Sequence, residues 1–262
     1  FIYEFVTGGG FLGRPGAPRP PESLLREGTA MAAAVMEDFG RIRGVKVAAM
    51  HDHRLSMLRL PASQICQVST AGEERAEFDA LASRCDWTLV IAPELSGDLS
   101  ARCCRVEAVG GRLLGSRPAL IDLTSDKHRT AEHLAAAGLP TPEGRSIDSG
   151  DFLPTDFPYP AVLKPRLGAG SQGVRRIASP PDGSGFQETL PARLERYCPG
   201  RPASVAFLCG PNQHIPLVPC TQRLTDDGMF TYLGGTLPLP EPLAARAIAL
   251  ACRAVAALPE PR

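Results

Sequence analysis

The amino-acid sequence predicts an α/β protein built from lobes in which helices pack on β-sheets. Continuous apolar runs at residues 44–50 and 87–92 are typical of buried parallel strands, and a shorter run at residues 1–6 precedes them. Apolar residues at helical spacings within residues 21–39 predict a helix between the first two strands. The chain has 262 residues, of which 44% are hydrophobic, so it can bury a large core in two or three lobes.

The charge balance and the distribution of apolar residues exclude several kinds of partner. Lys and Arg together number 28 and so do Asp and Glu, so no excess of basic residues indicates nucleic-acid binding. No stretch of about 20 apolar residues predicts a membrane span. The eight cysteines form no C-x-x-C pair, which is typical of buried thiols in a reducing compartment. No signal peptide is visible, and we expect a cytoplasmic protein.

The segment that follows the first predicted strand is rich in glycine and proline, which predicts a loop over residues 8–21. This loop leaves the carboxyl end of the strand, where open α/β sheets bind their ligands. Glu94 and Asp98 follow the apolar run at residues 87–92 and have the same relation to the sheet. A carboxylate there is suited to hold a substrate amine; solvated loop acids and an ordinary mobile loop are the alternatives.

A lysine and a glycine-rich loop follow the apolar run at residues 159–163. Lys164 would stand at the end of a strand, and residues 174–177 would form the returning strand. Backbone N–H groups of such a loop can face one anion, and the lysine adds a positive charge beside them. We therefore predict a polyphosphate site with ATP as its ligand. The loop residues expected to bind it are Gly168, Gly170, Ser171 and Gly173.

Two other interpretations of this loop compete with the ATP site. The loop matches G-x-G-x-x-G, the fingerprint of dinucleotide-binding proteins, but that fingerprint requires a helix to open within it. Residues 178–185 are too rich in proline and glycine to continue a helix. The other alternative is an ordinary glycine-rich hairpin turn.

A second lysine lies in the first turn of an alanine-rich helix predicted upstream of the loop. Ser125 or Asp126 is suited to cap the start of this helix, and Gly138 is suited to end it. Lys127 would then project from the first turn, where a lysine by itself is usually solvated. Together with Lys164 and the loop, Lys127 becomes a candidate for a second contact with phosphate.

At this point the chain resembles the ATP-grasp superfamily of carboxylate–amine ligases. The resemblance implies that Lys127 and Lys164 touch the phosphates of ATP and that the glycine loop closes over them. It also implies that Glu195 and the backbone near Cys198 face the adenine, with ATP and Mg²⁺ as cofactors. The motifs that carry it are, in chain order, residues 126–127, 138–142, 163–165, 168–173, 195–200 and 204–205.

The resemblance also implies a domain organisation and a class of reaction. A Rossmann-like pre-ATP-grasp domain would cover residues 1–115, a lid subdomain with its linking helix residues 116–194, and an incomplete C-terminal subdomain residues 195–262. The segments 5–10, 23–28, 92–99, 222–224 and 234–238 look like a branch that includes tyramine–glutamate ligase. The expected reaction joins an amino acid such as glutamate to a small amine through an acyl-phosphate, and a homodimer is a further hypothesis.

Two departures from the family pattern favour an alternative, a non-catalytic or degenerate nucleotide-binding protein. Pro202 stands where many members have a glutamate that holds the ribose hydroxyls, and a proline can accept only through its carbonyl. Family members bind Mg²⁺ through a late aspartate and a Glu-x-Asn step, whereas Asn212 is the only asparagine here and only Glu241 and Glu260 follow Asp227 as acids. We therefore expect no metal ligands in this chain, with the last metal-binding strands missing after a helix at residues 243–258.

Overall fold

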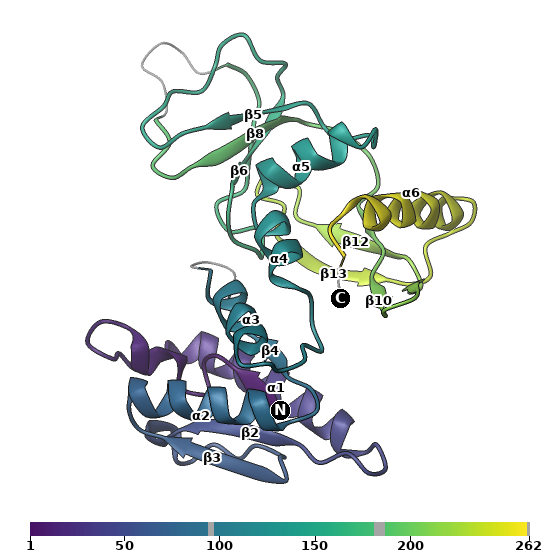
Figure 1. Cartoon of the computed structure of the whole chain (residues 1–262). Coiled ribbons are helices and arrows are strands. Elements are labelled where there is room, and N and C mark those ends of the chain that lie inside the picture. Colours follow the sequence, from purple (N-terminus) through teal and green to yellow (C-terminus); the bar gives the residue numbers. More distant parts are fainter. Residues whose placement is uncertain (94–96, 181–186, 261–262) are drawn as a thin grey trace. The chain divides into compact units, whose positions relative to one another are not determined.

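The computed structural model describes residues 1–93, 97–180 and 187–260, which form two compact units (Figure 1). Unit 1 comprises Phe1–Pro118 and unit 2 comprises Ala119–Arg262. Both units combine helices with β-sheets, which confirms the predicted α/β class. The further division of the second unit between residues 194 and 195 stays a prediction.

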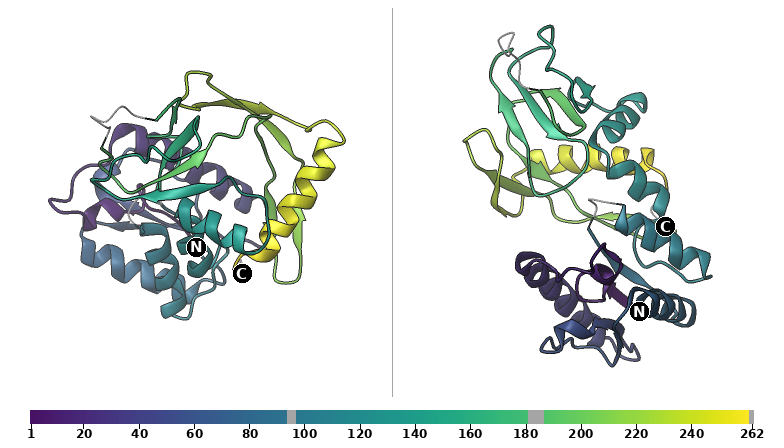
Figure 2. Two further views of the ribbon diagram at one scale, coloured as in Figure 1. Left: turned by 90° about the horizontal axis from the view of Figure 1, so that it is seen from above. Right: turned by 90° about the vertical axis from the view of Figure 1, so that its left-hand side faces the viewer.

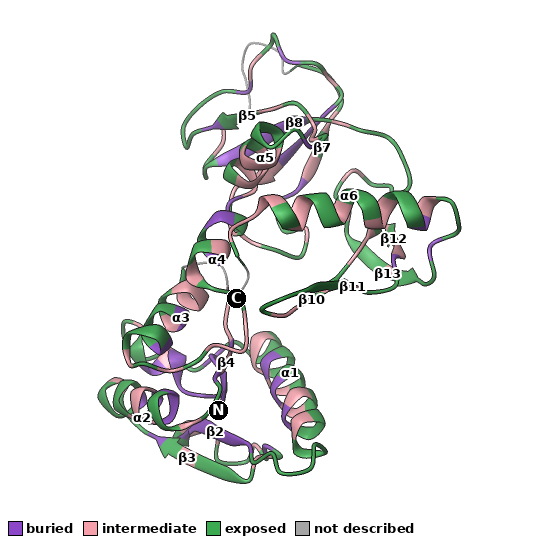
Figure 3. Cartoon of the chain, turned by 45° about the vertical axis from the view of Figure 1, so that its right-hand side comes forward, coloured by how far each residue is buried: buried purple, intermediate pink, exposed green. Residues whose placement is uncertain are grey.

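Unit 1 contains a parallel sheet of four strands in the order β3-β2-β1-β4. The predicted strands are present with shorter bounds, but the strand β3 was not predicted. Its sequence QICQV mixes polar and apolar residues because it lies at the sheet edge, and Figure 3 shows it largely exposed beside the buried β2. The bounds are β1 (Ile2–Glu4), β2 (Ala48–Asp52), β3 (Gln64–Val68) and β4 (Leu89–Ile91).

Helices cover both faces of this sheet, because successive side chains of each strand point to opposite faces. Ile2 packs with Ala32 and Met36 of α1 (Glu22–Gly40) in one apolar cluster. Its neighbour Tyr3 points the other way and meets Phe78 of α2 (Ala71–Arg84) edge to face, with ring centroids 4.8 Å apart. The remaining helices of unit 1 are η1 (Gly10–Gly13), η2 (His53–Leu55) and α3 (Asp98–Ala108).

A buried carboxylate organises the loop that leaves β1. Glu4, only 3% exposed, accepts hydrogen bonds from the backbone N–H of Val6 at 3.0 Å and of Thr7 at 2.7 Å. Burial raises the pKa of Glu4, and the bonds from these N–H groups oppose the rise. Gly28 of α1 lies against it, so that a Cβ at Gly28 would meet Oε1 of Glu4 at 2.7 Å.

Replacement of Gly28 tests this close approach. Ala is normally the better helix former, but in Gly28→Ala the new methyl group would displace a carboxylate that its hydrogen bonds hold in place. We expect the free energy of unfolding, measured with urea, to fall by about 2 kcal/mol. The control Gly40→Ala lies in the same helix with nothing within 4 Å of the added Cβ, and should raise stability by up to about 1 kcal/mol. Equal effects of the two substitutions would contradict the packing of Glu4 against Gly28.

Unit 2 contains an antiparallel sheet of four strands in the order β5-β8-β6-β7. Alternate side chains of β6 and β8 point to one face, where Leu163 and Leu194 join an apolar core with Ile147 and Phe157. The hairpin of β6 and β7 confirms the strand, loop and returning strand predicted around Lys164. The bounds are β5 (Gly144–Ile147), β6 (Ala161–Pro165), β7 (Arg175–Ile177) and β8 (Ala192–Arg196).

The helix predicted after Ser125 is present as α5 (Lys127–Ala136), preceded by α4 (Pro118–Thr124). Asp126 is its N-cap, with a side chain that accepts from the N–H groups of His128 and Arg129. The helix ends before Gly138, whose φ of +73° lies in the left-handed region. Lys127 is thus confirmed as the first residue of the helix.

The rest of unit 2 consists of a second sheet, a hairpin and a helix. The sheet has the order β13-β12-β9, and the segment between Leu224 and Tyr232 joins β12 to β13. The predicted last helix is present as α6, which lies beside this sheet in both views of Figure 2. The bounds are β9 (Ala203–Ser204), β10 (Phe207–Cys209), β11 (His214–Pro216), β12 (Cys220–Leu224), β13 (Tyr232–Thr236) and α6 (Leu243–Ala257).

Candidate nucleotide-binding site

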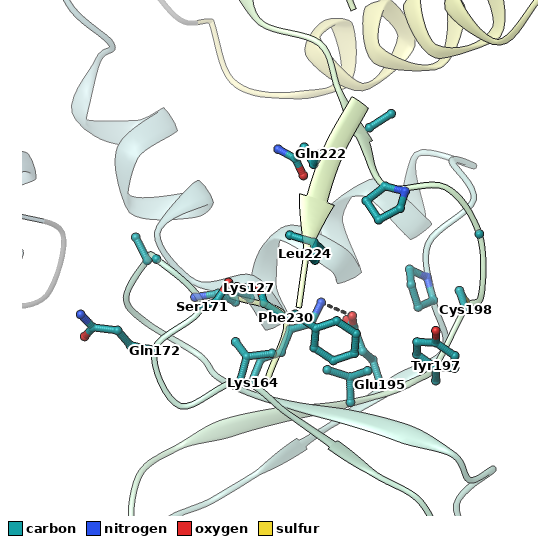
Figure 4. Close-up of a pocket in the computed structure, with 18 of the residues that line it drawn as sticks. Lys127, Lys164, Ser171, Gln172, Glu195, Tyr197, Cys198, Gln222, Leu224 and Phe230 are labelled. Atoms are coloured by element: carbon teal, nitrogen blue, oxygen red, sulfur yellow. Dashed lines mark hydrogen bonds and ion pairs between the residues drawn. The ribbon is translucent and has the colours of Figure 1, made fainter. Parts of the chain in front are cut away.

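A cavity of ≈ 750 Å³ lies within unit 2 and draws its walls from both sheets and from α5. The sheet β5-β8-β6-β7 contributes Val162, Lys164 and Glu195, and β12 contributes Gln222 and Leu224 (Figure 4). The glycine loop closes one end, and the segment after β8 closes the other. The volume is within the range of small-molecule and cofactor sites.

The pairing of β6 with β8 brings a lysine and a glutamate together in this cavity. Val162 is opposite Glu195 in the antiparallel register, and Lys164 is two residues further along the same face. Lys164 Nζ and Glu195 Oε1 form an ion pair, drawn dashed in Figure 4. Both residues line the cavity, where Glu195 is 9% exposed and Lys164 keeps a larger exposed fraction.

The second lysine reaches the cavity from the start of α5. Lys127 is tied to the end of β6 by its backbone N–H, which donates to the carbonyl of Arg166 at 2.9 Å. Its Nζ donates to the carbonyl of Gly168 in the loop at 2.6 Å. Burial lowers the pKa of Lys127 and the charge of Lys164 lowers it further, against the opposing effect of Asp126. Because the charge of Lys164 acts on Lys127 in this way, an anionic ligand between the two ammonium groups would be favourable.

The glycine loop between β6 and β7 has a backbone that most residues cannot adopt. Gly168, Gly170 and Gly173 have φ values of +98°, +68° and +70°, and Ser171 adopts +59°. The hydroxyl of Ser171 donates to the carbonyl of Phe230 at 2.8 Å, which joins the loop to the segment before β13. Gly168, Gly170 and Ser171 line the cavity, whereas Gly173 lies against Pro165 at the base of the loop.

Apolar and aromatic side chains also line the cavity. Val162 and Leu224 come from the two sheets, and Phe230 stacks on Tyr197 with ring centroids 6.2 Å apart and planes 29° apart. Cys198 is exposed and lines the same region. Apolar walls of this kind suit a flat heterocycle.

Two families of known proteins match the chain in sequence. A pre-ATP-grasp domain matches residues 45–121, and an ATP-grasp domain matches residues 124–262. The second match alone covers more than half of the chain. The chain belongs to the ATP-grasp family.

The relatives of this ATP-grasp chain among known proteins are ligases and synthetases. A D-alanine–D-alanine ligase from Caulobacter sp. (strain K31) is 27% identical over 258 residues, which cover 92% of this chain and 71% of the ligase. The proteins that this chain resembles thus include a ligase.

Solved structures show the same fold. An ATP-grasp superfamily protein from Archaeoglobus fulgidus aligns with a TM-score of 0.70 at 20% identity, over 100% of this chain and 73% of that protein. N5-carboxyaminoimidazole synthetase from Staphylococcus aureus, complexed with ADP, aligns with a TM-score of 0.66 at 17% identity. That alignment covers 98% of this chain and 62% of the synthetase, so the chain spans less than two thirds of its length.

The structure brings most of the predicted nucleotide residues to this one cavity. Of the candidates, Gly173 alone supports the loop without lining the cavity. Sequence reasoning missed Phe230 and Tyr197 as cavity residues, since nothing in the local pattern of an aromatic residue tells which loop it will face. Those that line it are Lys127, Lys164, Gly168, Gly170, Ser171, Glu195 and Cys198.

Pro202 also lines the cavity, and its carbonyl already accepts a hydrogen bond from the backbone N–H of Gln222 at 2.9 Å. The side chain of Gln222 faces the cavity nearby (Figure 4). An amide side chain both donates and accepts, so it can bind hydroxyl groups that the proline cannot. Gln222 is therefore a candidate polar contact for ligand hydroxyl groups, which the presence of a proline at position 202 does not reveal.

The predicted substrate carboxylates lie in unit 1. Asp98 is the first residue of α3 and forms an ion pair with Arg14, from the loop after β1. Glu94 lies outside the described residues. Their role toward a substrate amine stays a prediction.

Within residues 1–93, 97–180 and 187–260, no group of three or more His, Cys, Asp or Glu residues could hold a metal ion. Among the described residues that line the cavity, Glu195 is the one carboxylate, and it is paired with Lys164 and Arg193, so this donor set does not fit the Mg²⁺ that the family implies. No helix in the described part of the chain is long and apolar enough to cross a membrane.

Asp126, the N-cap of α5, holds the start of the helix from which Lys127 reaches the cavity. It accepts from Arg166 through both carboxylate oxygens as well as from the two N–H groups that it caps. Burial alone would raise the pKa of Asp126, but the bonds from Arg166, Arg129 and His128 outweigh it and hold the pKa below its ordinary value. The carboxylate form is therefore the one that stabilises the folded unit.

We expect Asp126→Ala to lower the free energy of unfolding at pH 7 by about 2 kcal/mol, since it removes the helix cap and the Arg166 pair. Asp126→Asn keeps a capping oxygen and should lose about half as much. Because the folded-state pKa is depressed, this stabilisation is present above the ordinary pKa of Asp and is lost as the pH falls through the folded-state value. Urea titrations at several pH values should show the gap between wild type and Asp126→Asn closing below about pH 4. A gap that persists in acid would contradict the ionic role of Asp126.

Proposed function

We propose that this chain binds ATP in the cavity of unit 2 and ligates a carboxylate to an amine through an acyl-phosphate. The observation that carries the proposal is the convergence of Lys127 and Lys164 on one glycine loop. Two separate parts of the chain supply these groups, the start of α5 and the hairpin of β6 and β7, so the arrangement is a built site rather than an isolated surface charge. Lys46 is the only other lysine in the sequence.

The triphosphate would lie at the end of the cavity formed by the lysines and the loop. Lys164 would leave Glu195 for the phosphates, and Lys127 would leave the carbonyl of Gly168. The pKa of Lys127 is lowered by burial and by Lys164, so a polyanion between the two ammonium groups would stabilise both charges. Loop N–H groups would add donors to the same phosphates.

The base of ATP would lie between the apolar walls, beside Glu195 and the backbone near Cys198. Val162 and Leu224 face the cavity from the two sheets, and the Tyr197–Phe230 stack borders it. Gln222 is the candidate contact to the ribose hydroxyls in place of an acid at Pro202.

The chemistry follows from this arrangement. An oxygen of the substrate carboxylate attacks the γ-phosphorus, the bond from that phosphorus to the bridging oxygen breaks, and ADP leaves. Lys127 and Lys164 neutralise charge on the transferring phosphoryl group. The amine nitrogen then attacks the carbonyl carbon of the acyl-phosphate, inorganic phosphate leaves, and the amine loses a proton to solvent. Since the described residues hold no metal-binding group, no step is assigned to a metal ion.

The proposed substrates are an amino acid, such as glutamate in the tyramine–glutamate ligase branch that the sequence resembles, and a small amine. The names of two relatives, D-alanine–D-alanine ligase and the L-amino acid ligase from Bacillus licheniformis, support an amino-acid substrate. Glu94 and Asp98, which follow the apolar run at residues 87–92 in the sequence, are the candidates to hold the amine.

The second candidate function is nucleotide binding without ligation. Pro202, which stands where many members of the family have a ribose-binding glutamate, favours it. Release of phosphate from ATP on addition of candidate amino acids and amines distinguishes the two. Turnover supports the ligase, whereas tight ATP binding without phosphate release across the substrate panel supports the binding protein.

Lys164→Ala tests the site itself. The substitution removes a phosphate contact and leaves the carboxylate of Glu195 facing the incoming phosphates. We expect the Kd for ATP, measured by calorimetry, to rise at least 30-fold, about 2 kcal/mol.

The matched control is Lys46→Ala, which removes an exposed lysine of unit 1 and should leave ATP affinity unchanged. Wild-type affinity in the Lys164→Ala variant would rule out this cavity as the ATP site.

A further inference from the structure

A buried arginine stands behind the glutamate of the nucleotide cavity. Arg193 is only 3% exposed, and it does not line the cavity. Each of its three guanidinium nitrogens has a partner: Nε donates to Glu195 Oε2 at 3.0 Å, one terminal nitrogen to His128 Nδ1 at 2.9 Å, and the other to the Pro142 carbonyl at 2.9 Å. All three nitrogens of the planar guanidinium are thus engaged, which a lysine with its single nitrogen could not reproduce.

The two oxygens of Glu195 are held by different cations. Oε1 pairs with Lys164, which faces the cavity, and Oε2 accepts from Arg193, which is enclosed between the sheet and α5. When Lys164 turns to the phosphates, Arg193 remains and Oε1 becomes free. A carboxylate held by one oxygen then presents the other as an acceptor toward the cavity.

The histidine that holds Arg193 is itself oriented. A guanidinium only donates, so Nδ1 of His128 must be the acceptor and the ring proton must be on Nε2. Nε2 faces Glu132 Oε1, one turn along α5, at 3.2 Å. His128 and Pro142 together prevent the guanidinium from following Glu195 toward the cavity.

We propose that Arg193 is a positioning residue that sets the base specificity of the site by holding Glu195 as a hydrogen-bond acceptor. This rests on the proposed function, in which Glu195 faces the base. A held carboxylate oxygen accepts from an exocyclic amino group and repels a carbonyl oxygen. The site therefore selects a 6-aminopurine over a 6-oxopurine, and the selection depends on Arg193 although Arg193 does not touch the nucleotide.

The experiment compares the Kd values for ATP and inosine 5′-triphosphate, which differ at the 6-position of the base and in the proton that the 6-oxo base carries on N1. Wild type should prefer ATP by at least about tenfold. In Arg193→Gln the preference should fall to within about threefold, because the freed Glu195 can rotate or follow Lys164. Arg193→Lys keeps one donor and the charge, and should give an intermediate preference even if Arg193→Gln does not fold.

The matched control is Arg145→Gln, which removes an exposed arginine of the same sheet paired with Asp156 and should keep the wild-type preference. A double-mutant cycle adds a second readout: in a Glu195→Gln background, whose amide both donates and accepts, changing Arg193 to Lys should not alter the preference further.

The possible failures are distinct. If wild type binds neither nucleotide, the proposed function fails. If wild type binds both equally, or if the Arg193 variants weaken both nucleotides by the same factor and keep the preference, Arg193 is only structural and the inference is overturned.

Discussion

The antiparallel register of β6 with β8 is the constraint on which the nucleotide cavity depends. Side chains alternate between the faces of a sheet, so this register sends Leu163 and Leu194 into the apolar core and Lys164 and Glu195 into the cavity. A slip by one residue would exchange the two sets and bury the charges in the core. Burying those charges would be unfavourable, so the packing of the apolar core fixes the register. The same register places Lys164 and Glu195 in the binding site.

Charge balance around the cavity follows from the same register. Glu195 is shared by Lys164 and Arg193, while Lys127 finds only a backbone carbonyl as its acceptor. Among the described residues that line it, the cavity thus has more cationic than anionic side chains, and Glu195 pairs with one cation that lines the cavity and one that does not. With this arrangement, Lys164 can leave Glu195 and pair with an anionic ligand, because Arg193 stays paired with the buried carboxylate of Glu195.

Unit 1 depends on a comparable close approach. Glu4 caps the loop after β1 because Gly28 leaves room for its carboxylate. The sequence does not reveal this contact, because Glu4 and Gly28 are far apart along the chain. A glycine within a helix usually only weakens the helix. Strand β3 was missed for a related reason, as an exposed edge strand lacks the continuous apolar run that identified its neighbours.

The sequence by itself determined the α/β class, the hairpin around the glycine loop, the helix that begins at Lys127, and the family. These depend on local signals such as caps, glycines and apolar runs, which act over a few residues. Only the tertiary structure decided that Phe230 joins the loop through Ser171, that Gln222 faces the cavity, and that Arg193 stands behind Glu195. Such contacts join residues distant in the chain, and their geometry is set by strand register and by the packing of α5, which no local pattern records.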